Sequence, residues 1–447
     1  MIPPTVSFTE ALKFWLKLGF ISFGGPAGQI AIMHKELVET RRWISEARFL
    51  HALNYCMILP GPEAQQLATY IGWLMHGTKG GIAAGALFVL PSLFILIGLA
   101  WIYMAFGQVG VVAGLLYGIK PAVTAIVLHA AWRIGSRVMK NAWLIGIAVA
   151  AFVAVFAANV PFPIIIGIAA LLGVAGGKWL PAAFTPGGGH KAAASVAGAT
   201  FIIDDTTPTP PHALFRWGRF AAYTGVGLAL WGGAMALLVA NTGMNGTLTN
   251  MGTFFTKAAL LTFGGAYAVL PYVYQGAVEN YQWLTATQMI DGLALGETTP
   301  GPLIMVVAFV GFVGGWTKQI LGPESLFLAG ALAAGVVTFF TFLPSFLFIL
   351  IGGPFIETTH GQLKFTAPLT AITAAVVGVI VNLAVFFAWH VWWPKASAAQ
   401  PFSGGFEFFS AALTVAAAIA LFRYKVGVIP VIAVCAAAGV VKHAVMG

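Results

Sequence analysis

Two helix-breaking motifs recur at one spacing inside long apolar segments, and they constrain the fold of this chain more than any other feature. Ser22-Phe23-Gly24-Gly25-Pro26 precedes Pro60-Gly61-Pro62, and Thr262-Phe263-Gly264-Gly265 precedes Pro300-Gly301-Pro302. A shift of 240 residues superimposes the two pairs. Glycine leaves the helical region of the backbone easily, and proline removes a helical hydrogen bond. The sequence therefore predicts a duplication in which each copy carries two breaks at matching positions.

Other residues match at the same shift and extend the duplication along the chain. The matched pairs are Lys17 and Lys257, Glu39 and Glu279, Trp43 and Trp283, and Ser45 and Thr285. LPSLFILIG at 90–98 matches LPSFLFILIG at 343–352 after an insertion of 13 residues around LGPESL in the second copy. So many matches in one order indicate duplication rather than chance.

The composition places these breaks in a membrane. Hydrophobic residues make up 59% of the 447 residues and charged residues 8%, whereas a soluble domain carries about 25% charged residues. Apolar segments long enough to span a bilayer recur along nearly the whole chain. They are 11–33, 50–75, 81–106, 109–132, 141–158, 161–176, 218–241, 252–275, 287–316, 326–352, 363–393, 405–421 and 426–445. We expect an all-α polytopic membrane protein.

The segments and the repeat predict four parts. The first repeat is 1–176, and the second is 250–447. Between them lie a polar linker at 177–217, rich in Gly, Pro, Ala and Thr, and an additional transmembrane helix at 218–241. This composition is typical of a flexible connection.

Basic residues predict the topology, because they concentrate in cytoplasmic loops. They cluster within 34–49, 133–140, 178–219 and 423–425. All four clusters are cytoplasmic if 11–33 with 50–75, and 252–275 with 287–316, form re-entrant hairpins. Nine segments then cross fully, the N-terminus is cytoplasmic, and five crossings between the hairpins give the two repeats inverted topology. A model with 13 full crossings keeps the inversion but places the 34–49 loop outside.

The breaks predict an anion-binding site. Non-helical backbone at membrane depth persists only where protein or a water-filled cavity satisfies its polar groups. Broken helices at matching positions of inverted repeats mark the binding sites of transporters, and the start of a half-helix attracts anions. We expect the FGG and PGP motifs to bind the substrate, with hydroxyl groups from Ser22 and Thr262 and polar lining from Gln65. The alternative is that the paired glycines only allow close helix packing.

Two carboxylates next to the PGP breaks are candidates for proton coupling. Pro62 and Pro302 are suited to open half-helices, which places Glu63 in the first turn of one of them. Glu297 lies just before the other break. Ionisable residues within a membrane are usually functional. Glu63 has the alternative role of a simple helix cap.

Four cations are further candidates. Lys17 and Lys257 match across the repeat and are positioned to attract an anion, or else to extend to the interface as long side chains do. Arg41 and Arg42 are candidates for an anion entrance, with the alternative that they only anchor the cytoplasmic face.

Several functions are not supported. Cys56 and Cys435 are the only cysteines, no cluster has metal-ligand spacing, and no P-loop is present, so we expect no cofactor, metal or ATP-driven motor. The net charge of +9 fits cytoplasmic loops better than nucleic-acid binding. No group of residues in the sequence has the pattern of an enzyme's catalytic site. A single chain contains both copies, so symmetry requires no oligomer.

The motif segments resemble the chromate ion transporter family in its long, two-domain form. They are SFGGPAGQIAIMHKELVETRRWISEARF, LPGPEAQQLATYIGW, TFGGAYAVLPYVYQGAVENYQWLTATQMIDG and TPGPL. The resemblance covers roughly 10–135 and 250–380. The positions that match the family motifs are Phe23, Gly24, Gly25, Pro26, Arg41, Arg42, Trp43, Pro60, Gly61 and Pro62.

The resemblance implies a carrier in the bacterial inner membrane that exports chromate, confers resistance to it and uses the proton motive force. This chain departs from the family at Glu63-Ala64-Gln65-Gln66, where many members carry small residues and serine. Chromate and sulfate are similar tetrahedral dianions, so a general oxyanion carrier is an alternative substrate assignment. An anion channel and an integral membrane enzyme are alternatives from other classes.

Overall fold

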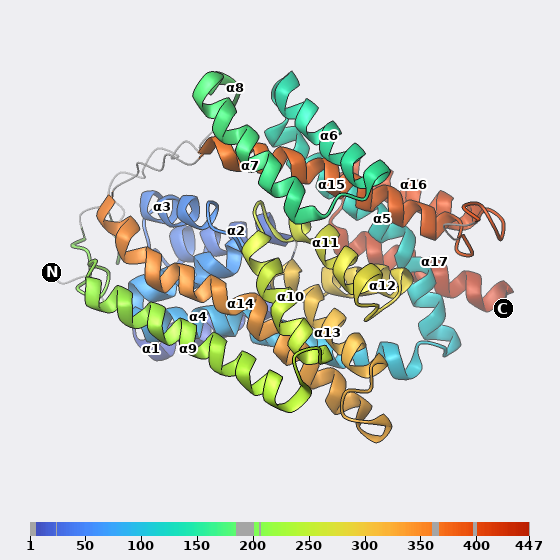
Figure 1. Cartoon of the computed structure of the whole chain (residues 1–447), viewed down its shortest axis with the longest axis horizontal. Coiled ribbons are helices and arrows are strands. Elements are labelled where there is room, and N and C mark those ends of the chain that lie inside the picture. The colour runs from blue at the N-terminus through green and yellow to red at the C-terminus, as the bar shows by residue number, and fades with distance from the viewer. Residues whose placement is uncertain are drawn as a thin grey trace.

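The protein is helical throughout the part that the structure describes (Figure 1). The computed structural model describes residues 6–23, 25–184, 201–204, 207–359, 366–396 and 400–446. Within these ranges, seven helices are long and apolar enough to cross a membrane: α4, α5, α7, α9, α14, α15 and α17. Three apolar helical stretches are shorter: Ala142–Ala158, Leu303–Thr317 and Phe408–Phe422. The chain is an all-α polytopic membrane protein, as the composition predicts.

The first half of the chain forms eight α-helices and one π-helix. They are α1 (Phe8–Ile21), α2 (Gly25–His34), η1 (Lys35–Thr40), α3 (Glu46–Cys56), α4 (Glu63–Phe106), α5 (Gly110–Val138), α6 (Ala142–Ala158), α7 (Phe162–Trp179) and α8 (Pro181–Phe184). Helix α4 bends where His76 and Gly77 leave the helical conformation, so residues 63–75 form a separate short helix.

The second half repeats this order after α9. Its elements are α9 (Trp217–Thr242), α10 (Thr247–Leu261), α11 (Ala266–Tyr274), η2 (Gln275–Asn280), α12 (Ala286–Thr298), η3 (Leu303–Met305), α13 (Val306–Thr317), η4 (Pro323–Ser325), α14 (Leu326–Thr359), α15 (Thr366–Trp392), α16 (Phe408–Phe422) and α17 (Val428–Met446). Helices α10 to α12 correspond to α1 to α3, and α15 to α17 correspond to α5 to α7.

Local sequence explains why the corresponding helices begin alike. The Ser45 hydroxyl accepts a hydrogen bond from Arg48 N at 3.2 Å and caps α3, and the Thr285 hydroxyl accepts one from Gln288 N at 3.2 Å and caps α12. An N-cap of this kind satisfies a backbone N–H that has no partner within the helix. Arg42 and Gln282, which are also 240 residues apart, both adopt positive φ after the two π-helices. The two copies thus share backbone detail as well as helix order.

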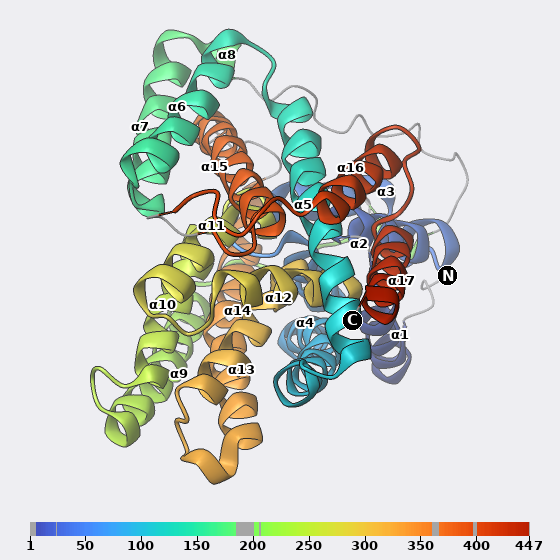
Figure 2. The same cartoon turned by 90° about the vertical axis from the view of Figure 1, so that its right-hand side faces the viewer.

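The two halves exchange their C-terminal helices. Helices α6 and α7 of the first half pack on α15 of the second, while α16 and α17 pack on α5 (Figure 2). The corresponding helices α5 and α15 contact each other, as do α4 and α14. Each half therefore completes the packing of the other, and the breaks of both halves lie within one common core.

Helix α9 lies at the edge of this core, against α10 and α14 (Figure 1). Only Gly227 of its residues is buried. Its outward side chains are apolar, with Val226 58%, Leu228 66% and Leu237 64% exposed. A helix of this kind fits a lipid-facing position at the membrane boundary.

Parts of the predicted linker at 177–217 are held against the first half. Ile202 N donates to Arg42 O at 3.2 Å, and Ile203 N donates to Trp43 O at 3.0 Å. The His212 ring bonds Trp73 O at 2.8 Å. The remainder of the predicted linker, 185–200 and 205–206, lies outside the described residues.

Candidate functional site

The FGG motif of each half meets the PGP motif of the other half. Gly61 N donates a hydrogen bond of 2.7 Å to the carbonyl oxygen of Thr262, and Gly301 N donates one of 2.8 Å to the carbonyl oxygen of Ser22. Ser22 and Thr262 correspond to each other, as do Gly61 and Gly301. The two hydrogen bonds therefore form a reciprocal pair between the copies.

Each bond satisfies backbone groups that the breaks would otherwise leave unpaired. Ser22 and Thr262 are the C-caps of α1 and α10, so their carbonyl groups lie beyond the helical ladder. At the end of each helix the chain makes the same tight turn, in which Phe23 N bonds Ile21 O at 3.0 Å and Phe263 N bonds Leu261 O at 2.9 Å. Buried backbone groups need such partners at membrane depth.

The glycines of the PGP motifs are required by both conformation and space. Gly61 has φ of 129° and Gly301 has φ of 105°, a region that other residues rarely adopt. A Cβ on Gly61 would lie 2.6 Å from the Ser345 hydroxyl oxygen, and one on Gly301 would lie 2.7 Å from Ser92 Cβ. The two neighbouring serines sit at matching positions in LPS segments of the two halves. A larger residue would push the breaks apart.

Four helices begin at this junction. Helix α2 starts at Gly25, α11 has Gly265 as its N-cap, α4 has Pro62 and η3 has Pro302. The helix-opening role of the two prolines fits their fixed φ and missing N–H. Helix starts carry partial positive charge and free N–H groups. Their convergence favours a bound anion.

Glu63 faces the FGG motif of the other half. A Cβ built on Gly265 would lie 3.4 Å from Glu63 Oε2 and 3.5 Å from its Oε1. The carboxylate thus sits beside the N-cap of α11 as well as at the start of its own helix, where the helix dipole stabilises negative charge. No salt bridge joins it to a basic side chain within the described ranges.

Glu297, near the end of α12, is 8% exposed. It accepts a hydrogen bond from the hydroxyl of Tyr267, the second residue of α11. Arg133 of α5 is close enough to interact electrostatically with both groups. Its Nη2 atom lies 3.9 Å from the position of a Cβ on Gly25. Arg133 therefore connects Glu297 with the first FGG motif.

Buried polar side chains surround the junction. Gln29 donates to the carbonyl oxygen of Gly301, Gln66 donates to Pro60 O at 2.8 Å, and Gln65 donates to the Thr69 hydroxyl at 3.0 Å. Among the described residues, no protein group pairs with Ser22 Oγ or with the side-chain oxygens of these three glutamines. Buried polar atoms are costly unless they are hydrogen-bonded, so this region favours a polar occupant such as water or an oxyanion.

Most of the predicted substrate-binding residues thus lie at one junction. The structure places there Ser22, Gly25, Pro60, Gly61, Pro62, Thr262, Gly265, Pro300, Gly301 and Pro302. Gln65 is buried further along α4, where its side chain contacts Thr69. Phe23, Pro26, Phe263 and Gly264 belong to the same breaks. Gly24 lies outside the described residues.

The four predicted cations occupy other environments. Lys17 and Lys257 are exposed on α1 and α10, which favours an interfacial role for both. Arg41 lies 5.0 Å from the ring centres of Phe14 and Trp43 and 3.4 Å from Glu36 Oε2, so it fastens the 34–49 loop to α1. The Arg42 side chain is exposed.

Two buried polar clusters were not predicted from the sequence. Arg48 of α3 donates to Glu357 Oε2 of α14 at 2.8 Å, and Tyr70 donates to the other oxygen of that carboxylate. Tyr103 of α4 donates to Asp291 Oδ2 of α12 at 3.0 Å, with Lys120 Nζ 3.6 Å away. Asp291 is a carboxylate within the apolar segment 287–316, which is the signal that would have identified it, whereas Glu357 lies beyond the 326–352 segment and only the longer α14 includes it.

No group of three or more His, Cys, Asp or Glu side chains within the described ranges is arranged to hold a metal ion. The junction offers backbone amides, hydroxyls and amides of glutamine, which suit an oxyanion, together with the carboxylates of Glu63 and Glu297.

The fold and junction define a polytopic membrane protein whose broken helices meet at a polar centre, the arrangement found in membrane transporters. The chromate transporter family model matches residues 9–174 and 249–440, and the chain belongs to this family.

Three relatives are similar over most of their length. The chromate transport protein of Pseudomonas aeruginosa is 32% identical over 383 residues, 85% of this chain and 80% of that protein. The probable chromate transport protein of Synechococcus elongatus is 28% identical over 384 residues, 86% of this chain and 85% of that protein. The chromate transport protein of Cupriavidus metallidurans is 28% identical over 389 residues, 86% of this chain and 84% of that protein. Among solved structures, none matches the chain at a significant level.

Proposed function

We propose that the protein exports chromate across the bacterial inner membrane and binds it where the FGG and PGP breaks meet. The observation that carries this proposal is the convergence of four helix starts, drawn from both halves and joined by two reciprocal backbone hydrogen bonds. Backbone N–H groups at helix starts bind oxyanions without a basic side chain. The names of the relatives support chromate as the transported ion.

The membrane potential supplies a driving force for export. Moving one elementary charge through 100 mV changes the free energy by about 2.3 kcal/mol. Moving a dianion out of a negative interior therefore lowers its free energy by about 4.6 kcal/mol at that potential. The outward direction thus needs no ATP, and the electrical part of the proton motive force is enough to sustain it.

Glu63 and Glu297 remain the candidates for proton coupling. A dianion held beside Gly265 lies next to the Glu63 carboxylate, and like charges repel. Oxyanion binding therefore favours the protonated form of Glu63. We expect a proton to bind together with the oxyanion rather than in exchange for it. One net negative charge then still leaves the cell for each proton carried, so the membrane potential continues to favour export.

We propose the following organisation in the membrane. The repeats at 1–176 and 250–447 have inverted topology, because the linker at 177–217 is followed by a single additional crossing at 218–241. The reciprocal hydrogen bonds and the exchanged C-terminal helices support a two-fold relationship of this kind. Helices α1 and α2, of 14 and 10 residues, are each shorter than the ~20 residues of a full crossing. The short helices support re-entrant hairpins, and the basic residues within 34–49 support a cytoplasmic N-terminus.

Transport in proteoliposomes tests the proposal. Purified protein is reconstituted, and chromate flux is measured with and without an imposed membrane potential and pH gradient, with sulfate as competitor. Flux that follows the potential and resists sulfate is the expected result. Equal inhibition by sulfate would indicate a general oxyanion carrier. Absence of flux for both ions, from correctly inserted protein, would refute a transport role for either oxyanion.

A further inference from the structure

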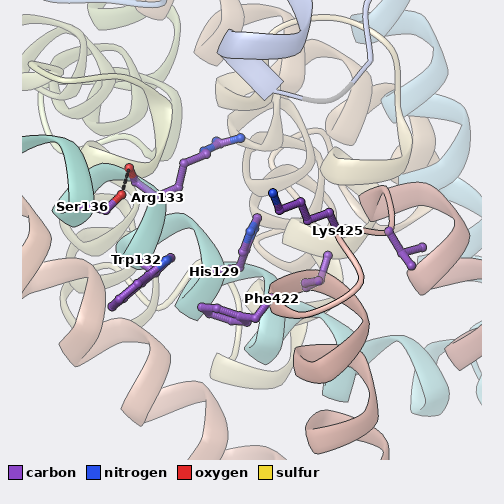
Figure 3. Close-up of a pocket in the computed structure, with 8 residues that line it drawn as sticks. His129, Trp132, Arg133, Ser136, Phe422 and Lys425 are labelled. Carbon is purple, nitrogen blue, oxygen red and sulfur yellow. Dashed lines mark hydrogen bonds between the residues drawn. The ribbon is translucent and has the colours of Figure 1, made fainter. Parts of the chain in front are cut away.

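A basic cavity lies beside the junction, between the C-terminal half of α5 and the turn that joins α16 to α17. Its volume is about 390 Å³. We refer to this cavity as the vestibule. It is lined by Leu421, Val426 and the labelled side chains of Figure 3: His129, Trp132, Arg133, Ser136, Phe422 and Lys425. One water takes up about 30 Å³ in the liquid, so the vestibule can hold a small oxyanion with part of its hydration shell.

Two cations and a histidine converge on this space. Figure 3 shows Arg133, His129 and Lys425 pointing toward one another from α5 and from the α16–α17 turn. In the described part of the chain, no carboxylate lies within salt-bridge distance of Arg133 or Lys425. Arg133 acts on the Glu297 carboxylate only at longer range, so both side chains can still bind a mobile anion.

The backbone supports this arrangement. Lys425 adopts φ of 53°, in the left-handed region that a lysine rarely occupies. This conformation closes the end of α16, where Val426 N donates to Ala420 O at 3.0 Å, and it fixes the position of Lys425 in the turn. His129 packs edge-on against Phe422, with ring centres 5.0 Å apart, so its ring is held at the wall of the vestibule.

Arg133 links the vestibule to the junction. The same side chain that lines the vestibule brings its Nη2 atom within 3.9 Å of the Cβ position on Gly25 and acts electrostatically on Glu297. An anion bound to this guanidinium thus lies next to the start of α2. The planar fork of arginine also matches two oxygens of a tetrahedral oxyanion, whereas lysine adds a compact charge.

We propose that the vestibule binds a tetrahedral oxyanion before Arg133 passes it to the FGG–PGP junction. This inference rests on the proposed transport function, which it extends to a second binding site. The basic residues around the vestibule place it on the cytoplasmic side by the positive-inside rule, where an exported ion would first bind.

The phosphate of an anionic lipid has the same chemistry and is the rival occupant. Trp132 is 64% exposed, as expected for a residue at the membrane interface. The inward reach of Arg133 to Gly25 favours a free oxyanion, because a lipid headgroup remains tethered at the interface and cannot move to the junction.

Tryptophan fluorescence offers a direct assay, because Trp132 lines the vestibule and chromate absorbs where tryptophan emits. Chromate is titrated into purified full-length protein in neutral detergent, and the Trp132→Phe variant identifies the part of the quenching that arises at the vestibule. We expect Arg133→Gln and Lys425→Gln to weaken this binding about 10- to 100-fold, as for loss of a charge-assisted hydrogen bond. Arg133→Lys should retain part of the affinity.

Arg137→Gln and Arg423→Gln are matched controls, since they remove a positive charge from the same helix and the same turn without lining the vestibule. They should bind chromate as the unmodified protein does. Wild-type affinity in both Arg133→Gln and Lys425→Gln would overturn the inference. So would Trp132 quenching that is present in neutral-lipid nanodiscs but is abolished by phosphatidylglycerol, since this identifies an anionic lipid headgroup as the occupant.

Failure of the proposed function gives a different pattern. Gly265→Val alters the junction but not the vestibule, so it should block transport in proteoliposomes while Trp132 quenching persists. Normal transport in Gly265→Val would refute the junction as the transport site. Loss of Trp132-dependent quenching in Gly265→Val would refute a separate vestibule site.

Discussion

Replacing Gly301 by alanine tests the junction most directly. Gly301 donates its N–H to Ser22 across the two halves and adopts φ of 105°. Its added Cβ would lie 2.7 Å from Ser92 Cβ and 3.2 Å from Ser92 Oγ, whereas Phe88 O is 3.5 Å away, at ordinary contact distance. Ser92 is the neighbour that must move, so the cost of backbone strain and the cost of this collision can be measured separately.

The two contributions have comparable size. Holding a residue other than glycine in this backbone region costs about 1–3 kcal/mol. Overpacking a buried contact by one methyl group costs about 1–3 kcal/mol more. We expect Gly301→Ala to reduce the free energy of unfolding by about 2–6 kcal/mol. Adding Ser92→Gly should restore only the part of the free energy of unfolding that the collision removes, about 1–3 kcal/mol. This part appears as a coupling energy in the double-mutant cycle.

The assay is denaturant unfolding of the purified protein in mild detergent, together with chromate flux in proteoliposomes. Gly98→Ala is the control on the same helix as Ser92, because a Cβ there meets no atom within 4 Å. This control should be neutral or slightly stabilising. If Gly301→Ala unfolds and transports as Gly98→Ala does, or if Ser92→Gly recovers nothing, the description of the junction is wrong.

Four further results are expected. Gly265→Val should abolish chromate flux while the protein still inserts, and normal flux would assign the second FGG break a structural role only. Glu63→Gln should remove the dependence of flux on pH, measured across a pH series at fixed membrane potential; an unchanged profile would exclude Glu63 as the proton carrier. A single reporter cysteine within 34–49 should react with a membrane-impermeant maleimide only from the cytoplasmic side, and labelling from outside would favour 13 full crossings. Glu357→Gln should cost about 3 kcal/mol in denaturant unfolding, because Arg48 loses its buried counter-ion; a change below about 1 kcal/mol would show that water solvates Arg48 in place.

The helix breaks could be predicted because their causes are local. Glycine and proline at Gly61-Pro62 and Gly301-Pro302 determine the backbone wherever they stand in the chain, and Ser45 and Thr285 cap helices through hydrogen bonds three residues away. The repeat then brought these signals together at one spacing. Helix breaks and caps can therefore be predicted without knowledge of the tertiary contacts.

The contacts between the halves could not be predicted in the same way. Arg133 reaches Gly25 only because α5 crosses the core beside α2, and Arg48 meets Glu357 only because α14 returns to α3. Their separations in sequence are far beyond the range of helical periodicity. The sequence assigned Arg133 only to a cytoplasmic cluster. It also made Lys17 and Lys257 candidates to attract an anion, whereas their exposed positions favour the interfacial alternative.

The two copies keep the backbone of the junction alike but differ in the side chains that carry its chemistry. Glu63 corresponds to Leu303, Glu297 to Met57, Tyr267 to Ala27 and Gln29 to Val269. The reciprocal hydrogen bonds and the glycines are duplicated, whereas both carboxylates face the second FGG motif. A symmetric junction with symmetric side chains would offer two equivalent anion sites. The observed asymmetry instead favours one oriented site, in which the second FGG motif holds the oxyanion beside the carboxylates and the first FGG motif, next to Arg133, receives it from the vestibule.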